Sequence, residues 1–263
     1  MQAEGTEGGI PPGLLARLDD LWFENYAAWA RAHPLGRVQQ TDGWRIASLG
    51  SPWPFYNVAT AVEGQDPDPS RLRAAFGDVG GYRVWLRDGM DVAESALRAA
   101  GFSGELELPA YLAPLGQARG DARAPAGYEF GRAKDRREVE ESVWGDLGSP
   151  WLGVDDATAT FPDPWTMAQG ADRRFYQARQ AGRLVATGQS LLHAGLVGIY
   201  GMWTDEAHRG RGLATALLQL ILQDGATAGV DYATLQAAYP GGGLYAAAGF
   251  SRRYTYRVYR DLL

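Results

Sequence analysis

The chain has 263 residues, of which 46% are hydrophobic and 21% are charged, and its formal net charge is −6. This composition is typical of a globular protein with one or two domains, and the negative charge argues against binding to nucleic acid. No apolar run approaches the roughly 20 residues of a membrane span, the three histidines are scattered, and cysteine is absent. We therefore expect a cytoplasmic protein without disulfide bonds, a cysteine nucleophile, a metal site, or a nucleic-acid or membrane partner.

The first half of the chain is predicted to begin with a helix and to continue with strands and short helices. Residues 1–13 are acidic and rich in glycine, which predicts a flexible lead-in rather than a signal peptide. Apolar residues at helical spacing predict a helix over 14–32, which Pro34 ends. Sequence patterns and turn residues predict two strands within 37–50, a strand at 55–62, a helix at 66–77, a strand at 81–89, a helix at 91–102 and a strand at 105–112.

The second half follows a segment rich in alanine, glycine, proline and charge, which we interpret as a linker at 116–127. The stretch 148–170 is broken by prolines and is predicted to be irregular. The other predicted elements are a strand at 128–133, a helix at 135–146, strands at 173–180, 182–195 and 196–204, a helix at 212–225, a strand at 230–238, a short helix at 241–250 and a closing strand at 251–263.

An internal repeat relates the two halves. The segment AAGFS at 99–103 recurs 148 residues later at 247–251, and the order of predicted elements agrees at the same offset. The alternative is a chance match between two alanine-rich helix ends. The repeat predicts two tandem units, at 14–115 and 128–263. The first copy has Leu97 where the second has Tyr245, and an acidic, proline-broken segment replaces a glycine-arginine loop, so we expect the first copy to be degenerate.

That loop, HRGRGLAT at 208–215, precedes an amphipathic helix. The first N–H groups of a helix lack intrahelical partners and carry partial positive charge, which favours a bound phosphate. Gly210 and Gly212 allow the backbone to approach such a group closely, and two arginines add charge. The Walker loop is excluded because the only lysine is Lys134, and the dinucleotide fingerprint fails because Thr215 stands at its third glycine. The alternative is a solvated turn.

The loop matches R-x-x-G-x-A at Arg209, Gly212 and Ala214, and LYAAAGF follows at 244–250. These segments resemble the acyl-CoA-binding motifs of the GNAT superfamily of N-acyltransferases. The resemblance is strong over 196–263, weaker over 126–195, and limited to the fold in the first half. It implies an α/β fold of two GNAT-like units, each a mixed, mostly antiparallel sheet flanked by helices. One departure is Ala238, where many family members have an asparagine that contacts the cofactor.

The resemblance implies an acetyl-CoA site in the second unit. The pantetheine arm would pair with the exposed backbone of Met202, Trp203 and Thr204, and the backbone N–H near Trp203 would stabilise the oxyanion. Tyr245 would protonate the leaving thiolate; the alternative is a tyrosine that only packs. The pyrophosphate would be held by the loop residues Arg209, Gly210, Arg211, Gly212, Leu213, Ala214 and Thr215.

The general base is the least determined part of the predicted site. His193, near the end of a strand, is one candidate, although a lone histidine there is more often structural. Asp205 and Glu206 lie just before the loop, where solvated carboxylates are equally expected, and a chain of waters is a further possibility.

The acceptor pocket is predicted in the irregular segment 150–165, whose acidic and aromatic residues suit a cationic, partly apolar amine; the alternative is a solvated loop. The candidate residues are Trp151, Asp155, Asp156, Phe161 and Trp165. The predicted function is acetyl-CoA-dependent N-acetylation of a small primary amine by direct attack, in a monomer or homodimer. The alternatives are a non-catalytic acyl-CoA sensor and a tandem transferase that makes a thiol metabolite or uses aminoacyl-tRNA.

Overall fold

The computed structural model describes residues 10–11, 13–50, 53–77, 79, 81–117, 124–147, 162–237 and 243–262. The helices are α1 (Leu14–Arg31), α2 (Pro69–Phe76), α3 (Asp91–Ala99), α4 (Arg136–Leu147), α5 (Pro164–Gly170), α6 (Leu213–Thr227) and α7 (Gly243–Ala247). The strands are β1 (Arg37–Thr41), β2 (Trp44–Ser48), β3 (Val58–Ala61), β4 (Arg83–Arg87), β5 (Phe102–Pro114), β6 (Glu129–Arg132), β7 (Arg173–Gln180), β8 (Arg183–His193), β9 (Leu196–Thr204), β10 (Tyr232–Gln236) and β11 (Ser251–Asp261). None of the described helices combines the length and apolar character that a membrane span requires.

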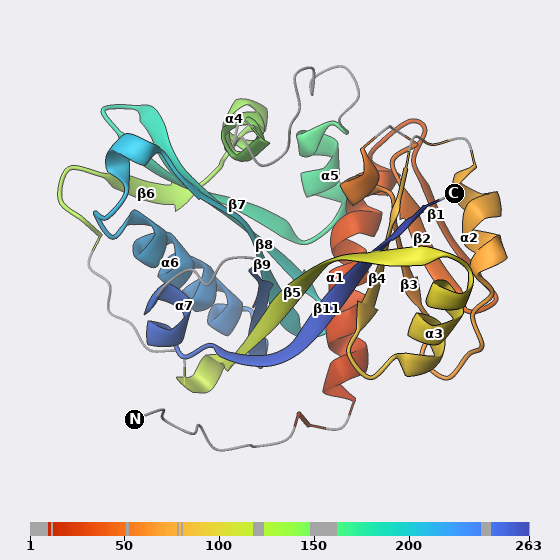
Figure 1. The fold of residues 1–263 in the computed structure, drawn as a ribbon. Helices are drawn as coiled ribbons and strands as arrows, with labels where there is room; N and C mark the ends of the chain where they lie inside the picture. Colours follow the sequence, from red (N-terminus) through yellow and green to blue (C-terminus); the bar gives the residue numbers. More distant parts are fainter. Residues whose placement is uncertain are drawn as a thin grey trace.

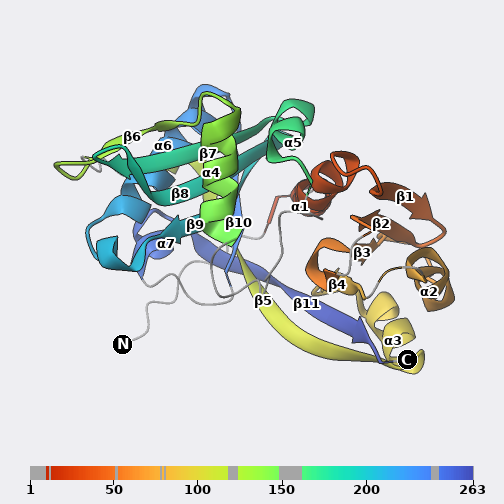
Figure 2. The ribbon, with the colours of Figure 1, turned by 90° about the horizontal axis from the view of Figure 1, so that it is seen from above.

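All these strands form one sheet of eleven strands in the order β1-β2-β3-β4-β11-β5-β10-β9-β8-β7-β6. Neighbouring strands are antiparallel except for the pairs β3–β4 and β9–β10, which are parallel. The predicted fold class, a mixed and mostly antiparallel sheet flanked by helices, is confirmed. The sheet is continuous through both halves because β5 and β11 lie side by side in its middle, where they cross the molecule as two long ribbons (Figures 1 and 2).

The last strand of each half is paired with the other half. Strand β11 is antiparallel to β4, and β5 is antiparallel to β10, so each final strand lies beside the parallel pair of the opposite half. The two halves therefore repeat the same pairing pattern around the β5–β11 contact. Gly101 and Gly249, equivalent in the predicted repeat, both have φ of 89°. The duplication and the boundaries of its units stay predictions.

The segment 148–170 differs from its predicted irregular conformation where the structure describes it, because α5 forms over its last residues. Asp163 caps this helix by accepting hydrogen bonds from the N–H groups of Trp165 and Thr166, and Pro164 occupies the first helical position. An aspartate followed by a proline is a helix start signal. The sequence interpretation treated the prolines of this segment as helix breakers and so missed the helix. Residues 148–161 lie outside the described residues.

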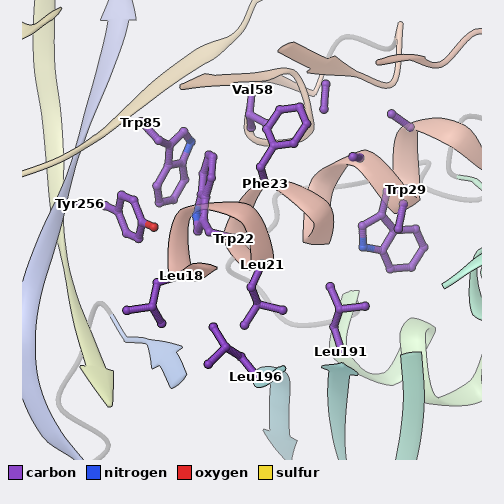
Figure 3. Close-up of a cluster of buried hydrophobic side chains, with 14 of the residues drawn as sticks. Leu18, Leu21, Trp22, Phe23, Trp29, Val58, Trp85, Leu191, Leu196 and Tyr256 are labelled. Carbon is purple, nitrogen blue, oxygen red and sulfur yellow. The ribbon is translucent and has the colours of Figure 1, made fainter. Parts of the chain in front are cut away.

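Helix α1 packs between the two halves and joins their cores (Figure 1). Its Leu21 is completely buried and faces Leu191 and Leu196 at the junction of β8 and β9 (Figure 3). Burying a leucine of this size contributes roughly 1.5–3 kcal/mol. On the other side of the helix, Trp22 packs with its ring centroid 5.3 Å from that of Trp85 on β4. The core that supports the second half therefore includes a helix of the first.

Candidate functional site

Strands β9 and β10 separate beyond their first residues and leave part of β9 without a neighbour on that side. Their parallel pairing ends at Ile199 and Leu235, whereas β9 continues through Thr204 alongside β8. The β8–β9 register shifts opposite Gly188, and Gly201 has φ of 55°, so a β-bulge re-aims β9 where the two strands diverge. The structure thus gives Met202, Trp203 and Thr204 an open strand edge within the described residues.

The glycine-arginine loop follows this open strand and forms the N-terminus of α6. Gly210 and Gly212 have φ of 72° and 80°, the left-handed conformation that glycine adopts without a steric penalty. Gly212 is the N-cap residue and offers no side-chain cap, and the first helical hydrogen bond runs from Ala216 N–H to Gly212 C=O. The N–H groups of residues 213–215 precede this bond, as at any helix start, and are available to an anion.

The two loop arginines are held by the protein without a carboxylate partner in the described part of the chain. Arg209 Nε donates to Thr204 O at 3.2 Å, and Arg211 donates to Ala207 O and to Tyr128 Oη at 3.1 Å. Tyr128 Oη also lies 3.1 Å from Nδ1 of the buried His208. The positive charge of both arginines is therefore free to act on a ligand. The sequence contained no signal for Tyr128, because it lies 80 residues before its partner.

A surface groove of about 470 Å³ brings this loop together with α7. Its walls come from the end of β9, the loop, the first turn of α6 and the first turn of α7. The lining residues are Thr204, His208, Arg209, Gly210, Gly212, Leu213, Ala214, Thr215 and Leu244.

Tyr245 follows Leu244 on α7 and is half-buried against the core of the second half. Its ring centroid lies 6.0 Å from that of Phe250. Burial raises the pKa of the phenol above its ordinary value of 10, so the hydroxyl keeps its proton at neutral pH. Tyr245 is thus a neutral phenol that directly follows Leu244, a residue of the groove wall.

The three candidate bases lie in different places. His193 pairs with Leu196 at the start of β9, so eight residues of strand, about 26 Å, separate this position from Thr204. The structure does not bring His193 to the loop. Asp205 accepts from Ala207 N–H at 3.0 Å and pairs with Arg183 at 2.5 Å, which gives it a local structural role. Glu206 is exposed.

Of the predicted acceptor residues, only Trp165 lies within the described part of the chain. It is half-buried on α5 and packs against the core around α1, on the sheet face opposite α6. The other four candidates, Trp151, Asp155, Asp156 and Phe161, fall outside the described residues.

The first half has a pocket of about 480 Å³ that overlaps the groove in part when the two halves are compared at the predicted offset of 148 residues. Residues 61–66 and 89–93 line it, which correspond to 209–214 and 237–241 at the offset of the repeat. Glu63, Asp66 and Asp91 are among the lining residues, so its charge repels a phosphate. The described residues nevertheless contain no group of three or more acidic or histidine side chains placed to hold a metal ion.

The open strand edge, the loop at the start of α6 and the neutral tyrosine lie in one region of the mixed α/β sheet. Residues 137–250 match the family model described as "Acetyltransferase (GNAT) family". The resemblance inferred from the two motifs is therefore confirmed, and the fold is that of an acetyltransferase.

Solved structures support the fold over nearly the whole chain. A GCN5-related N-acetyltransferase from Kribbella flavida aligns with a TM-score of 0.72 at 19% identity, covering 96% of this chain and 97% of that one. A GCN5-related N-acetyltransferase-like protein from Streptococcus suis aligns with a TM-score of 0.56 at 16% identity, covering 94% and 96%. A GCN5-related N-acetyltransferase from Sphaerobacter thermophilus aligns with a TM-score of 0.55 at 18% identity, covering 83% and 76%. A search of curated proteins found no match.

Proposed function

We propose that this protein transfers an acetyl group from acetyl-CoA to the primary amine of a small molecule. The observation that carries the proposal is the continuity of the open β9 edge with the loop at the start of α6. An extended pantetheine chain needs unpaired backbone groups, and a pyrophosphate needs helix N–H groups and positive charge. This chain has both within the segment from Met202 to Thr215. A cytoplasmic location, and a monomer or homodimer, stay predictions from the sequence.

The residues present fit acetyl-CoA as a substrate. The backbone of Met202, Trp203 and Thr204 would bind its pantetheine amides, and the loop from Arg209 to Thr215 would hold its pyrophosphate. Gly210 and Gly212 keep side chains out of the space that the phosphates need.

The transfer would take place by direct attack, a route that suits a chain without a cysteine to carry the acetyl group. The unprotonated amine nitrogen forms a bond to the thioester carbon and gives up one proton to a chain of waters, and the carbon–sulfur bond breaks as the tetrahedral centre collapses. The backbone N–H near Trp203 would stabilise the negative oxygen. Tyr245 would give its proton to the leaving thiolate, which suits a phenol that burial keeps protonated.

A panel of primary amines, incubated with acetyl-CoA and the protein, tests this proposal. Released CoA can be measured with a thiol reagent without background, because the protein itself contains no thiol. The proposal predicts thiol release with at least one amine and an acetylated product by mass spectrometry. Acetyl-CoA binding without turnover on any amine would instead support the non-catalytic sensor, and no binding would contradict both.

A further inference from the structure

A buried arginine lies on the opposite face of the sheet from the groove. Arg173, the first residue of β7, is 5% exposed. Its guanidinium donates to Gln189 Oε1 at 3.1 Å, and to the Oδ1 and backbone O of Asn25 at 2.6 and 3.2 Å. It lies between two aromatic rings, 5.6 Å from the centroid of Trp29 and 5.5 Å from that of Tyr200. All these partners are neutral.

No carboxylate pairs with Arg173 within the described part of the chain. The carboxylate that acts on it at longer range is that of Glu24, whose two oxygens accept from Arg31 at 2.5 and 3.1 Å. Burial lowers the pKa of Arg173 to about 10, which still leaves the guanidinium charged at neutral pH. Its Nε–H has no hydrogen-bond partner, and neither has the nearby Tyr200 hydroxyl.

A buried guanidinium without a carboxylate partner, next to unpartnered polar groups, lowers the stability of the folded protein. A buried charge without a counter-ion loses its hydration, and amide oxygens and aromatic faces recover only part of the loss. An unpartnered Nε–H beside an unpartnered hydroxyl adds two unsatisfied donors. A ligand that brings a carboxylate would supply the missing charge and acceptors, and the planar guanidinium is the side chain best matched to that group.

The position of the cluster places it beside the predicted reaction centre. Tyr200 is the first β9 residue beyond the last β9–β10 pair, and Gln189 lies opposite it on β8. The Tyr200 ring folds back over Gly198, where a Cβ atom would lie 2.6 Å from the hydroxyl. The Tyr200 hydroxyl and Arg173 Nε are buried, whereas Tyr200 as a whole is only partly buried, so the cluster lies just beneath the surface where the strand edge opens.

The first half of the chain completes this cluster. Asn25 and Trp29 come from α1, and Figure 3 shows Trp29 projecting from that helix toward Leu191 on β8. The second half alone would leave Arg173 without two of its three hydrogen bonds and without one of its aromatic faces.

We propose that Arg173 and Tyr200, with Asn25 holding the guanidinium in place, bind the carboxylate of an amino-acid-type acceptor, so that the amine acetylated by this protein belongs to a molecule that also carries a carboxylate. The inference rests on the proposed acetyl transfer for the role of the amine. The carboxylate site itself is a binding property that can be measured without turnover. It also gives the first half a function in acceptor recognition.

The test uses the full-length protein and matched ligand pairs, namely the common L-amino acids and their C-terminal amides. Binding is measured by saturation-transfer NMR and calorimetry, with and without desulfo-CoA. At least one acid should bind about 10- to 100-fold more tightly than its amide, the range expected for a charge-assisted hydrogen bond. Equal binding of acids and amides, or no binding of any acid, would overturn the proposal.

Two variants separate this site from a structural role. Arg173→Met should abolish the preference for the acid, and its melting temperature without ligand is measured alongside because methionine leaves the oxygens of Asn25 and Gln189 without their donor. Arg174→Met is the control, since Arg174 is adjacent and alternation along β7 directs it to the opposite face of the sheet. Unchanged acid preference in Arg173→Met would assign Arg173 to packing alone.

Tyr200→Phe serves if Arg173→Met does not fold. It removes only the hydroxyl and should weaken acid binding by about 3- to 10-fold, the effect of one hydrogen bond, without changing amide binding. Equal effects on acid and amide would overturn the proposal. Titration with acetyl-CoA runs in parallel, so a failed acetyl-CoA site and a failed carboxylate site give different results.

Discussion

Gly210 offers a direct test of the loop because a matched glycine lies at the other end of the same helix. Gly210 has φ of 72° and Gly229, just beyond the end of α6, has φ of 75°. A Cβ added at either position would meet no atom within 4 Å, so the cost of alanine is conformational at both. The left-handed conformation costs an alanine about 1–2 kcal/mol, and the loss of unfolded-state freedom offsets roughly 0.4–1 kcal/mol of this.

Both alanine variants should therefore lower stability by about 1 kcal/mol, which corresponds to a melting temperature about 2–4 °C lower. Only Gly210 lines the groove. The free loop of Gly210→Ala can relax, and acetyl-CoA binding must restore the strained conformation. The dissociation constant should then rise by up to about 5- to 30-fold, the equivalent of 1–2 kcal/mol. Calorimetric titration measures this rise, and Gly229→Ala should bind as the wild type does. Equal affinities in the two variants would refute the role of the loop.

Three further predictions concern the proton donor, the bulge and acid stability. Tyr245→Phe should lower kcat about 100-fold with an unchanged KM for acetyl-CoA; a wild-type kcat would show that the tyrosine only packs. Gly188→Ala places a Cβ 2.6 Å from Met202 Sδ and should destabilise the protein by about 1–3 kcal/mol in urea unfolding; unchanged stability would show that Met202 moves freely. The hydrogen bond from Arg179 lowers the pKa of Glu141 below 4.5, so the stability it contributes is present above that pH and lost as the pH falls below it. Glu141→Gln should therefore lose less stability between pH 5 and pH 3 than the wild type, and an equal loss would exclude this pair as a cause.

The parts of the structure that were predicted correctly depend on local patterns. The helix at 14–32 and the strands at 173–180, 182–195 and 196–204 follow from periodicity and from glycine-containing turns, which act within a few residues. The loop at 208–215 was identified for the same reason, since its glycines and arginines are contiguous and the helix begins directly after them.

The parts that sequence reasoning missed depend on contacts between distant segments. Nothing local indicates that β11 inserts between β4 and β5, because either order would satisfy the alternation of the strands. The same holds for Arg173, whose burial becomes visible only when Asn25 on α1 packs against β7. His193 illustrates the converse, because its residue type suggested a base. It lies on β8 opposite Leu196, and Leu196 is at the end of β9 that is far from the loop.

The most direct test of the central claim is calorimetric titration of acetyl-CoA into the wild type and into the double variant Arg209→Ala with Arg211→Ala. A control double variant, Arg71→Ala with Arg98→Ala, makes the same change in net charge on α2 and α3 of the first half. The loop predicts micromolar binding to the wild type and to the control, and a loss of at least about tenfold in the loop variant, as expected for two charge-assisted contacts. Equal binding to all three proteins, or no binding to the wild type, would contradict the account.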